Sequence, residues 1–117
     1  MTSPDCLFCR IVRGEIPATI VHSTAKIIAF RDIAPKAPVH VLVIPRDHHA
    51  DVAALAEADP ALAGALLAAV GVVAAGEGID VSGYRTIFNS GPDGGQEVAH
   101  VHAHVLGGAP LGTAIVP

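Results

Sequence analysis

Aromatic side chains, charges and cysteines are all scarce in this chain of 117 residues. Aromatic residues make up 3% of it, with no tryptophan, and charged residues make up 15%. Hydrophobic residues make up 51%, which excludes general disorder because the chain can bury a core. That core must consist mainly of Ala, Val, Leu and Ile. At this length we expect one domain over residues 1–117.

The lack of surplus positive charge excludes one class of partner. Seven Lys and Arg residues against eleven Asp and Glu residues give a formal net charge of −4. A protein that binds the DNA or RNA backbone needs a basic face, so we expect no nucleic-acid partner. A small phosphate ligand stays compatible with this charge, because a few local donors are enough to bind it.

Only two cysteines occur, Cys6 and Cys9, and the polar residues 1–5 have no secretory signal pattern. A secreted domain of this size more often carries several cysteine pairs, so we expect a cytoplasmic protein. The apolar run over 61–76 is shorter than the roughly 20 residues that cross a bilayer. It predicts a buried helix and no membrane partner.

Hydrophobic patterns predict five strands and one long helix. The strands are expected where β-branched and apolar residues are concentrated between turns, over 19–22, 26–31, 39–44, 84–89 and 99–106. The long helix is expected to start at Asp59 and Pro60 and to run to about Glu77. Short helices are predicted over 6–13 and 51–56. Consecutive strands with short connections favour an α+β domain on a mainly antiparallel sheet.

Small residues recur along one side of the predicted long helix, at Gly64, Ala68, Gly71 and Ala75. One interpretation is simply an Ala-rich helix that packs under a sheet. The other is the close approach of a second helix, for example from a second subunit. The spacing favours neither interpretation over the other.

Three histidines, His100, His102 and His104, alternate with apolar residues in the last predicted strand. Successive side chains of a strand point to opposite faces, so the three imidazoles share one face. A neutral imidazole can be a nucleophile, a base or a metal ligand. The preceding Gly94 and Gly95 allow a ligand to approach backbone N–H groups, which predicts an anion-binding loop beside the histidines.

The order of several motifs resembles the histidine triad nucleotide-binding family over nearly the whole chain. The motifs are Cys6-x-x-Cys9 with Ile11-Val-Arg-Gly-Glu-Ile-Pro17, Ala29-Phe-Arg-Asp32-Ile33, Ala37-Pro-Val-His40-Val-Leu-Val-Ile-Pro45, Asp93-Gly-Gly-Gln-Glu97-Val and His100-Val-His-Ala-His-Val-Leu-Gly-Gly108. The Gly-Gly-Gln-Glu motif resembles the version of this motif found in the bacterial branch of the family's nucleoside phosphoramidases. The resemblance implies a HIT-like fold with about five strands, one long helix and one or two short helices.

The resemblance also implies a hydrolase that cleaves purine nucleoside 5′-phosphoramidates or related AMP conjugates. His102 would be the nucleophile and form a nucleotidyl-histidine, His104 would contact the phosphate, and His40 would hold the triad segment. Glu97 would lie beside the phosphate, where some relatives have serine. The other contacts to base, ribose and phosphate would be Leu7, Phe8, Phe30, Asp32, Ile33, Asn89, Gly95 and Gln96. The family needs no cofactor for this reaction, and it implies a homodimer with a purine nucleotide as ligand.

Cys6 and Cys9 have the spacing of half a tetrahedral zinc site. Relatives with this cysteine pair complete the site with two histidines, which here are His48 and His100. The resemblance therefore implies a structural zinc, with His49 as an alternative to His48. The other interpretation is two small buried residues on a short helix.

Two further functions stay open. A His-x-His pair on one strand is a common metal half-site, so His102 and His104 could bind the metal of a metalloenzyme, with His40 as a third ligand. Alternatively, a non-catalytic nucleotide sensor or scaffold would keep the same fold without useful turnover.

Overall fold

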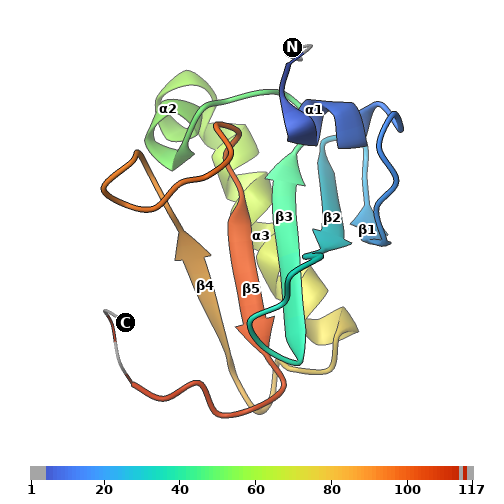
Figure 1. Ribbon diagram of the computed structural model, residues 1–117, viewed down its shortest axis with the longest axis vertical. Coiled ribbons are helices and arrows are strands. Elements are labelled where there is room, and N and C mark those ends of the chain that lie inside the picture. The colour runs from blue at the N-terminus through green and yellow to red at the C-terminus, as the bar shows by residue number, and fades with distance from the viewer. Residues whose placement is uncertain (1–4, 114, 116–117) are drawn as a thin grey trace.

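The fold is described by a computed structural model, which covers residues 5–113 and 115 (Figure 1). Its elements are α1 (Leu7–Val12), β1 (Ile20–Ser23), β2 (Ile27–Arg31), β3 (Val39–Pro45), α2 (Val52–Ala58), α3 (Pro60–Gly76), β4 (Tyr84–Phe88) and β5 (Ala103–Gly107). The five strands form one sheet in the order β1-β2-β3-β5-β4, and every neighbouring pair is antiparallel. The predicted α+β fold is confirmed. The first four residues and part of the predicted C-terminal tail lie outside the described residues.

Alternation along the central strands gives the sheet two different faces. Val41 and Val43 of β3 and Val105 of β5 are fully buried in the core that the sheet forms with α3. α3 lies behind the sheet in the view of Figure 1, and α1 lies at the upper end of the other face. Alternate residues of β2 and β3 form a second, smaller apolar cluster with α1. The face opposite α3 is therefore where polar side chains of β3 and β5 can gather.

α3 begins as its sequence predicts and presents its small residues to solvent. The Asp59 side chain caps the helix by accepting from the Leu62 N–H at 3.0 Å, and Pro60 occupies the first turn. Leu62 and Leu66 are buried against the sheet. The small-residue stripe is exposed on the opposite side, at Gly64, Ala68, Gly71 and Ala75. Packing under the sheet is thus not the reason for the stripe. Across the described ranges, no helix has the length and apolar character needed to cross a membrane.

The prediction of a histidine strand over 99–106 is wrong at its start. β5 begins at Ala103, whose register partner is Val43 of β3. The residues before it hydrogen bond outside the sheet, because the His100 N–H donates to the Val98 carbonyl and the Val101 N–H to the His49 carbonyl, both at 2.8 Å. The first two histidines of the triad therefore precede the ladder, on a segment that other contacts must hold.

Candidate functional site

Histidines from three parts of the chain gather on the sheet face opposite α3. His40 of β3 and His104 of β5 lie across the β3–β5 ladder, with ring centroids 5.2 Å apart. The His102 ring lies 4.9 Å from that of His104. The Phe8 ring meets both His100 and His102 edge-on, at 6.0 and 5.1 Å. The prediction that the three triad imidazoles share one face is confirmed.

The surroundings of His102 select one neutral tautomer. Its Nδ1 lies 2.8 Å from the His100 carbonyl oxygen. A carbonyl can only accept, so the proton is on Nδ1 and the neutral ring has its lone pair on Nε2. The side chain is buried, and Phe8 packs against it from α1. The ring is thus held with a single unprotonated nitrogen.

A second chain of hydrogen bonds sets the protons of His40 and His104. The Lys36 backbone N–H donates to His40 Nδ1 at 3.0 Å, so the His40 proton is on Nε2. His40 Nε2 then donates to His104 Nδ1 at 3.0 Å. The neutral His104 ring consequently carries its proton on Nε2. The Asp32 carboxylate lies 3.5 Å from His40 Nε2 and brings a negative charge to this chain.

Burial favours the neutral form of both rings. The pKa of His104 falls from 6.5 to about 4, mainly because the ring is desolvated and then because His102 and His40 lie beside it. Desolvation also lowers the pKa of His40, against the opposing effect of Asp32. His104 therefore stays neutral at pH 7 and presents an N–H donor rather than a positive charge.

The two glycines of the predicted anion loop are needed for different reasons. A Cβ on Gly94 would lie 2.3 Å from the Ser90 carbonyl oxygen, so the loop closes too tightly there for any side chain. Gly95 has φ +78°, a conformation that glycine adopts without strain. Asn89 Nδ2 donates to the Gly94 carbonyl at 2.7 Å and ties the loop to the end of β4.

Gln96 fastens the same loop to its neighbours through both ends of its amide. Its Oε1 accepts from the Gly91 N–H at 3.0 Å. Its Nε2 donates to the carbonyls of Ala50 and Val98 at 2.7 and 3.0 Å. These three hydrogen bonds hold the loop in its conformation. The contact of Gln96 with a phosphate stays a prediction. The adjacent Glu97 is exposed.

The predicted base and ribose residues divide into buried and exposed sets. Phe8 and Phe30 are buried and meet edge-on at 5.5 Å. Leu7 is 45% exposed, and Ile33, in the loop after β2, is fully exposed. Asp32 is half-buried and reaches the histidines through His40. The exposed apolar side chains near these histidines are compatible with a flat aromatic ligand, and their nucleotide roles stay predictions.

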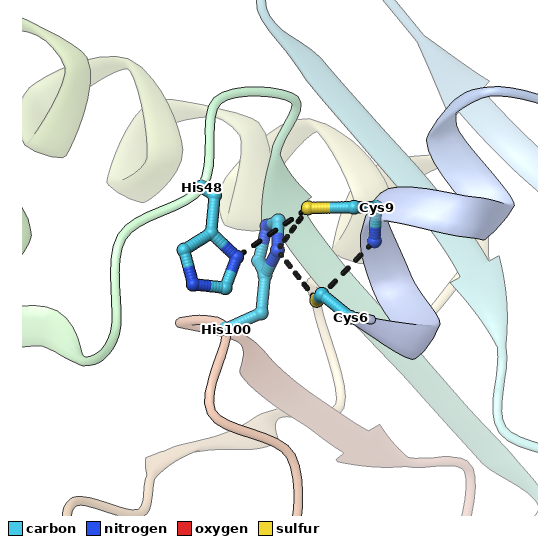
Figure 2. Close-up of side chains that lie close together, drawn as sticks. All are labelled: Cys6, Cys9, His48 and His100. Atoms are coloured by element: carbon cyan, nitrogen blue, oxygen red, sulfur yellow. Dashed lines mark hydrogen bonds between the residues drawn. The ribbon is translucent and has the colours of Figure 1, made fainter. Parts of the chain in front are cut away.

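Four side chains converge beside α1 into what we term the Cys–His cluster: Cys6, Cys9, His48 and His100 (Figure 2). Cys6 Sγ lies 3.4 Å and Cys9 Sγ 3.5 Å from His100 Nδ1, and Cys9 Sγ lies 3.4 Å from His48 Nδ1. In a tetrahedral zinc site, Zn–S and Zn–N bonds of about 2.3 and 2.05 Å place sulfur and nitrogen about 3.6 Å apart. The spacing of the cluster fits that geometry.

The hydrogen bonds of His100 fit a metal ligand as well. Its Nε2 donates to the Pro45 carbonyl at 2.8 Å, which leaves a lone pair on Nδ1. Two sulfurs approach that one lone pair, and a single S–H···N bond can satisfy only one of them, whereas a shared cation satisfies both. Burial lowers the pKa of His100 to about 4, which keeps the ring neutral. His49 is not among the converging side chains.

One other group in the described ranges brings ligand atoms within 4.8 Å of one another: Asp32, His40 and His104. His102 belongs to neither group, so the metal-binding set that pairs His102 with His104 is not assembled. In addition, His104 Nδ1 already accepts from His40. The geometry in this region is that of a hydrogen-bonded chain.

Sequence reasoning missed two backbone groups that orient the histidines. They are the Lys36 N–H, which fixes the tautomer of His40, and the Pro45 carbonyl, which fixes that of His100. Backbone groups leave no residue-type signal in a sequence. Only the prolines on either side of β3 indicate that the chain turns sharply there.

Comparison with known proteins places the chain in a family. The HIT domain model matches residues 13–111, and the chain belongs to that family. An uncharacterized HIT-like protein of Synechococcus elongatus is 50% identical over 109 residues, 93% of this chain and 95% of that protein. The purine nucleoside phosphoramidase of Escherichia coli K12 is 42% identical over 108 residues, 92% of this chain and 91% of the enzyme. A HIT family hydrolase from Clostridium thermocellum matches with a TM-score of 0.94 at 42% identity, over 98% of this chain and all of that structure.

We predict that His104 makes stability depend on pH in the mildly acidic range. Its pKa is about 4 when folded and near 6.5 when unfolded, so between these values the unfolded chain binds the extra proton. Stability should therefore fall as pH drops from 6.5 toward 4, and this one group can contribute up to about 1.4 kcal/mol per pH unit. Urea unfolding at several pH values should give a shallower dependence for His104→Gln than for the wild type. Equal dependences would contradict the assignment.

Proposed function

We propose that the chain is a hydrolase that cleaves purine nucleoside 5′-phosphoramidates or related AMP conjugates through a covalent histidine intermediate. The observation that carries the proposal is the bond from His102 Nδ1 to the His100 carbonyl, which leaves a lone pair on a held Nε2. Similarity to the E. coli purine nucleoside phosphoramidase supports this substrate class. The neutral His104 N–H beside His102 supplies a donor for a phosphate oxygen.

In the first step, His102 Nε2 attacks the α-phosphorus. The P–Nε2 bond forms as the bond from phosphorus to the amine nitrogen breaks, and the amine nitrogen takes up a proton from solvent as it leaves. The ring becomes a cationic nucleotidyl-imidazole, whose Nδ1–H still donates to the His100 carbonyl. His104 Nε2–H donates to the phosphate and stabilises its charge as the bonds change.

In the second step, water attacks the same phosphorus and the P–Nε2 bond breaks. The products are the nucleoside monophosphate and a neutral His102, with the proton of the water passing to solvent. Splitting one displacement into two easier displacements is the general benefit of a covalent intermediate. No metal takes part in either step.

The remaining predicted contacts bind the substrate. Asp32 accepts from the ribose hydroxyls, and the glycine loop surrounds the phosphate. The exposed carboxylate of Glu97, at the position where some relatives have serine, lies beside the phosphate. The base contacts apolar side chains from α1, β2 and the loop after β2, namely Leu7, Phe8, Phe30 and Ile33. The phosphate contacts Asn89, Gly95 and Gln96.

His102→Ala should lower kcat toward a fluorogenic adenosine phosphoramidate by on the order of 10³-fold or more, because it removes the nucleophile. Rapid acid quenching of the wild type should trap a nucleotidyl group on the protein, detected by intact mass. The matched control is His22→Ala, a histidine of β1 outside the site, which should keep wild-type turnover. Wild-type activity should also survive EDTA as long as any metal in the Cys–His cluster stays bound.

Equal turnover by wild type and His102→Ala would reject the nucleophile assignment. Loss of activity in EDTA without loss of metal from the Cys–His cluster would favour the metalloenzyme alternative. Tight AMP binding without turnover by the wild type would favour the nucleotide sensor or scaffold.

We also propose that the Cys–His cluster binds a structural zinc. The donor set of two thiols and two imidazoles suits zinc, and the sulfur–nitrogen spacings support this choice. Bound zinc supplies a cross-link between α1, the loop after β3 and the segment before β5. It leaves no open position for substrate, since all four ligands come from the chain.

Metal analysis of tag-free protein purified without chelator should find one zinc per chain. His48→Ala should lose it, because His48 Nδ1 points at Cys9 Sγ (Figure 2). His49→Ala is the matched control and should keep it. Absence of stoichiometric zinc from the wild type, or equal zinc content in the two variants, would overturn the proposal.

We propose further that the chain forms a homodimer through the outer side of α3. This 17-residue helix contains no charged or polar side chain, although one side of it faces solvent. A helix that is apolar all round is normally covered. Leu67 and Val72 are 59% and 55% exposed on that side, next to the small-residue stripe. Small residues allow two helices to approach closely, which favours a second copy as the cover.

Leu67→Glu should convert the protein from dimer to monomer at micromolar concentration in sedimentation velocity, because it places a charge in the proposed interface. Ile20→Glu is the matched control, since Ile20 is a similarly exposed apolar residue on the edge strand β1. The control should stay dimeric. A monomeric wild type would reject the dimer, and monomers from both variants would reject this interface.

A further inference from the structure

The Cys–His cluster and the catalytic histidines meet in a single residue, His100. Its ring lies against the sulfurs of Cys6 and Cys9, and its backbone carbonyl accepts from Nδ1 of His102. The first contact belongs to the cluster, and the second decides which nitrogen of His102 carries the lone pair. Displacement of His100 would therefore alter both.

The segment that carries His100 gets little support from the sheet. The register pairs of β5 begin at Ala103, after both His100 and His102. The His100 ring is instead held between the Pro45 carbonyl and the cysteines, and the next residue, Val101, donates to the His49 carbonyl. The loop after β3 thus holds this segment through its backbone, while its His48 side chain reaches the cluster (Figure 2).

α1 adds a second connection between the cluster and the nucleophile. Phe8 lies between the two cysteines in the sequence, and its ring packs edge-on against His102 at 5.1 Å. The same ring lies 6.0 Å from that of His100. The contacts that hold α1 at the cluster therefore also place the ring that borders the buried side of His102.

We propose that Cys6, Cys9 and His48 are positioning residues for His102, acting through the His100 carbonyl and the Phe8 ring. The expected loss of kcat rests on the proposed function, whereas the expected change in the position of the His102 proton does not. If the cluster is loosened, the peptide of His100 moves relative to His102. The ring then loses the acceptor that keeps its proton on Nδ1, and the competing tautomer places the proton on the attacking nitrogen. Misplacement of a reacting group by about 1 Å can lower a rate by about 100-fold.

This arrangement predicts a larger loss in kcat than in substrate binding. Asp32 and Ile33 follow β2 and are not part of the cluster, so the ribose and base contacts from that loop stay in place. Loss of an outer contact that orients a functional histidine typically costs about 10- to 100-fold in activity. We expect a decrease of that size in kcat and a smaller rise in KM, because Leu7 and Phe8 of α1 are also proposed base contacts.

The test compares three variants with the wild type, each as the full chain. His48→Ala removes one member of the cluster, together with its edge-on ring contact to His100 at 5.0 Å, and leaves the side chains of His100 and Phe8 in the sequence. His48→Cys restores a sulfur ligand of similar reach and should recover most of the loss. Leu66→Ala is the stability control, because Leu66 is buried in the core on the other side of the sheet. All four proteins are assayed for kcat and KM, thermal midpoint and the ¹⁵N–¹H signal of the His102 Nδ1–H group.

The expected result is a kcat 10- to 100-fold lower in His48→Ala with loss of the His102 Nδ1–H signal, and recovery of both in His48→Cys. Leu66→Ala should lower the thermal midpoint but keep kcat and the signal. If His48→Ala keeps both and loses only thermal stability, the cluster is merely structural and the proposal is overturned. If His48→Ala does not fold, wild-type protein whose proposed zinc is removed with a zinc chelator such as a phenanthroline gives the same two readouts. If the wild type does not cleave phosphoramidates, the proposed function fails, and the His102 signal alone still decides the positioning role.

Discussion

The hydrogen bond from His102 Nδ1 to the His100 carbonyl is the contact on which the site depends. An imidazole has two nitrogens and one exchangeable proton when neutral, so a fixed donor or acceptor is needed to assign the lone pair to one of them. Here the acceptor is a backbone carbonyl 2.8 Å away on a buried segment. A carbonyl does not titrate, and it can never donate. The assignment therefore does not depend on the protonation of a neighbouring group.

The sheet supports this bond because one of its faces buries apolar side chains and the other buries hydrogen-bonded histidines. On one face, Val41, Val43 and Val105 pack under α3 and supply the apolar core. On the other face, His40 and His104 occupy alternate positions of the same strands and satisfy each other. Every buried side-chain nitrogen or oxygen among the described residues has a hydrogen-bond partner. The polar face is thus buried without the penalty of an unpaired group.

Much of this could be predicted from the sequence, and the exceptions share a physical cause. Period-two alternation and the Asp59–Pro60 pair locate the strands and the start of α3, because they reflect local geometry. Alternation alone cannot show that His100 and His102 precede the ladder, since that depends on where their N–H groups find acceptors. The choice between His48 and His49 is similar: two adjacent residues of one type differ only in the backbone that aims them. The outward direction of the small-residue stripe likewise depends on tertiary packing.

His100 explains why one histidine can belong to both the Cys–His cluster and the proposed site of His102. Its Nδ1 meets the cysteine sulfurs, its Nε2 donates to Pro45, its carbonyl accepts from His102 and its N–H donates to Val98, so all four polar groups are engaged. A cysteine could replace the contact with the sulfurs, but its side chain has no N–H group to donate to the Pro45 carbonyl. An asparagine could donate to that carbonyl, but its amide oxygen is a poor ligand for the proposed zinc, which favours sulfur and imidazole. Histidine alone supplies a soft-metal ligand and an opposed N–H donor on one rigid ring, which keeps its own backbone carbonyl in place for His102.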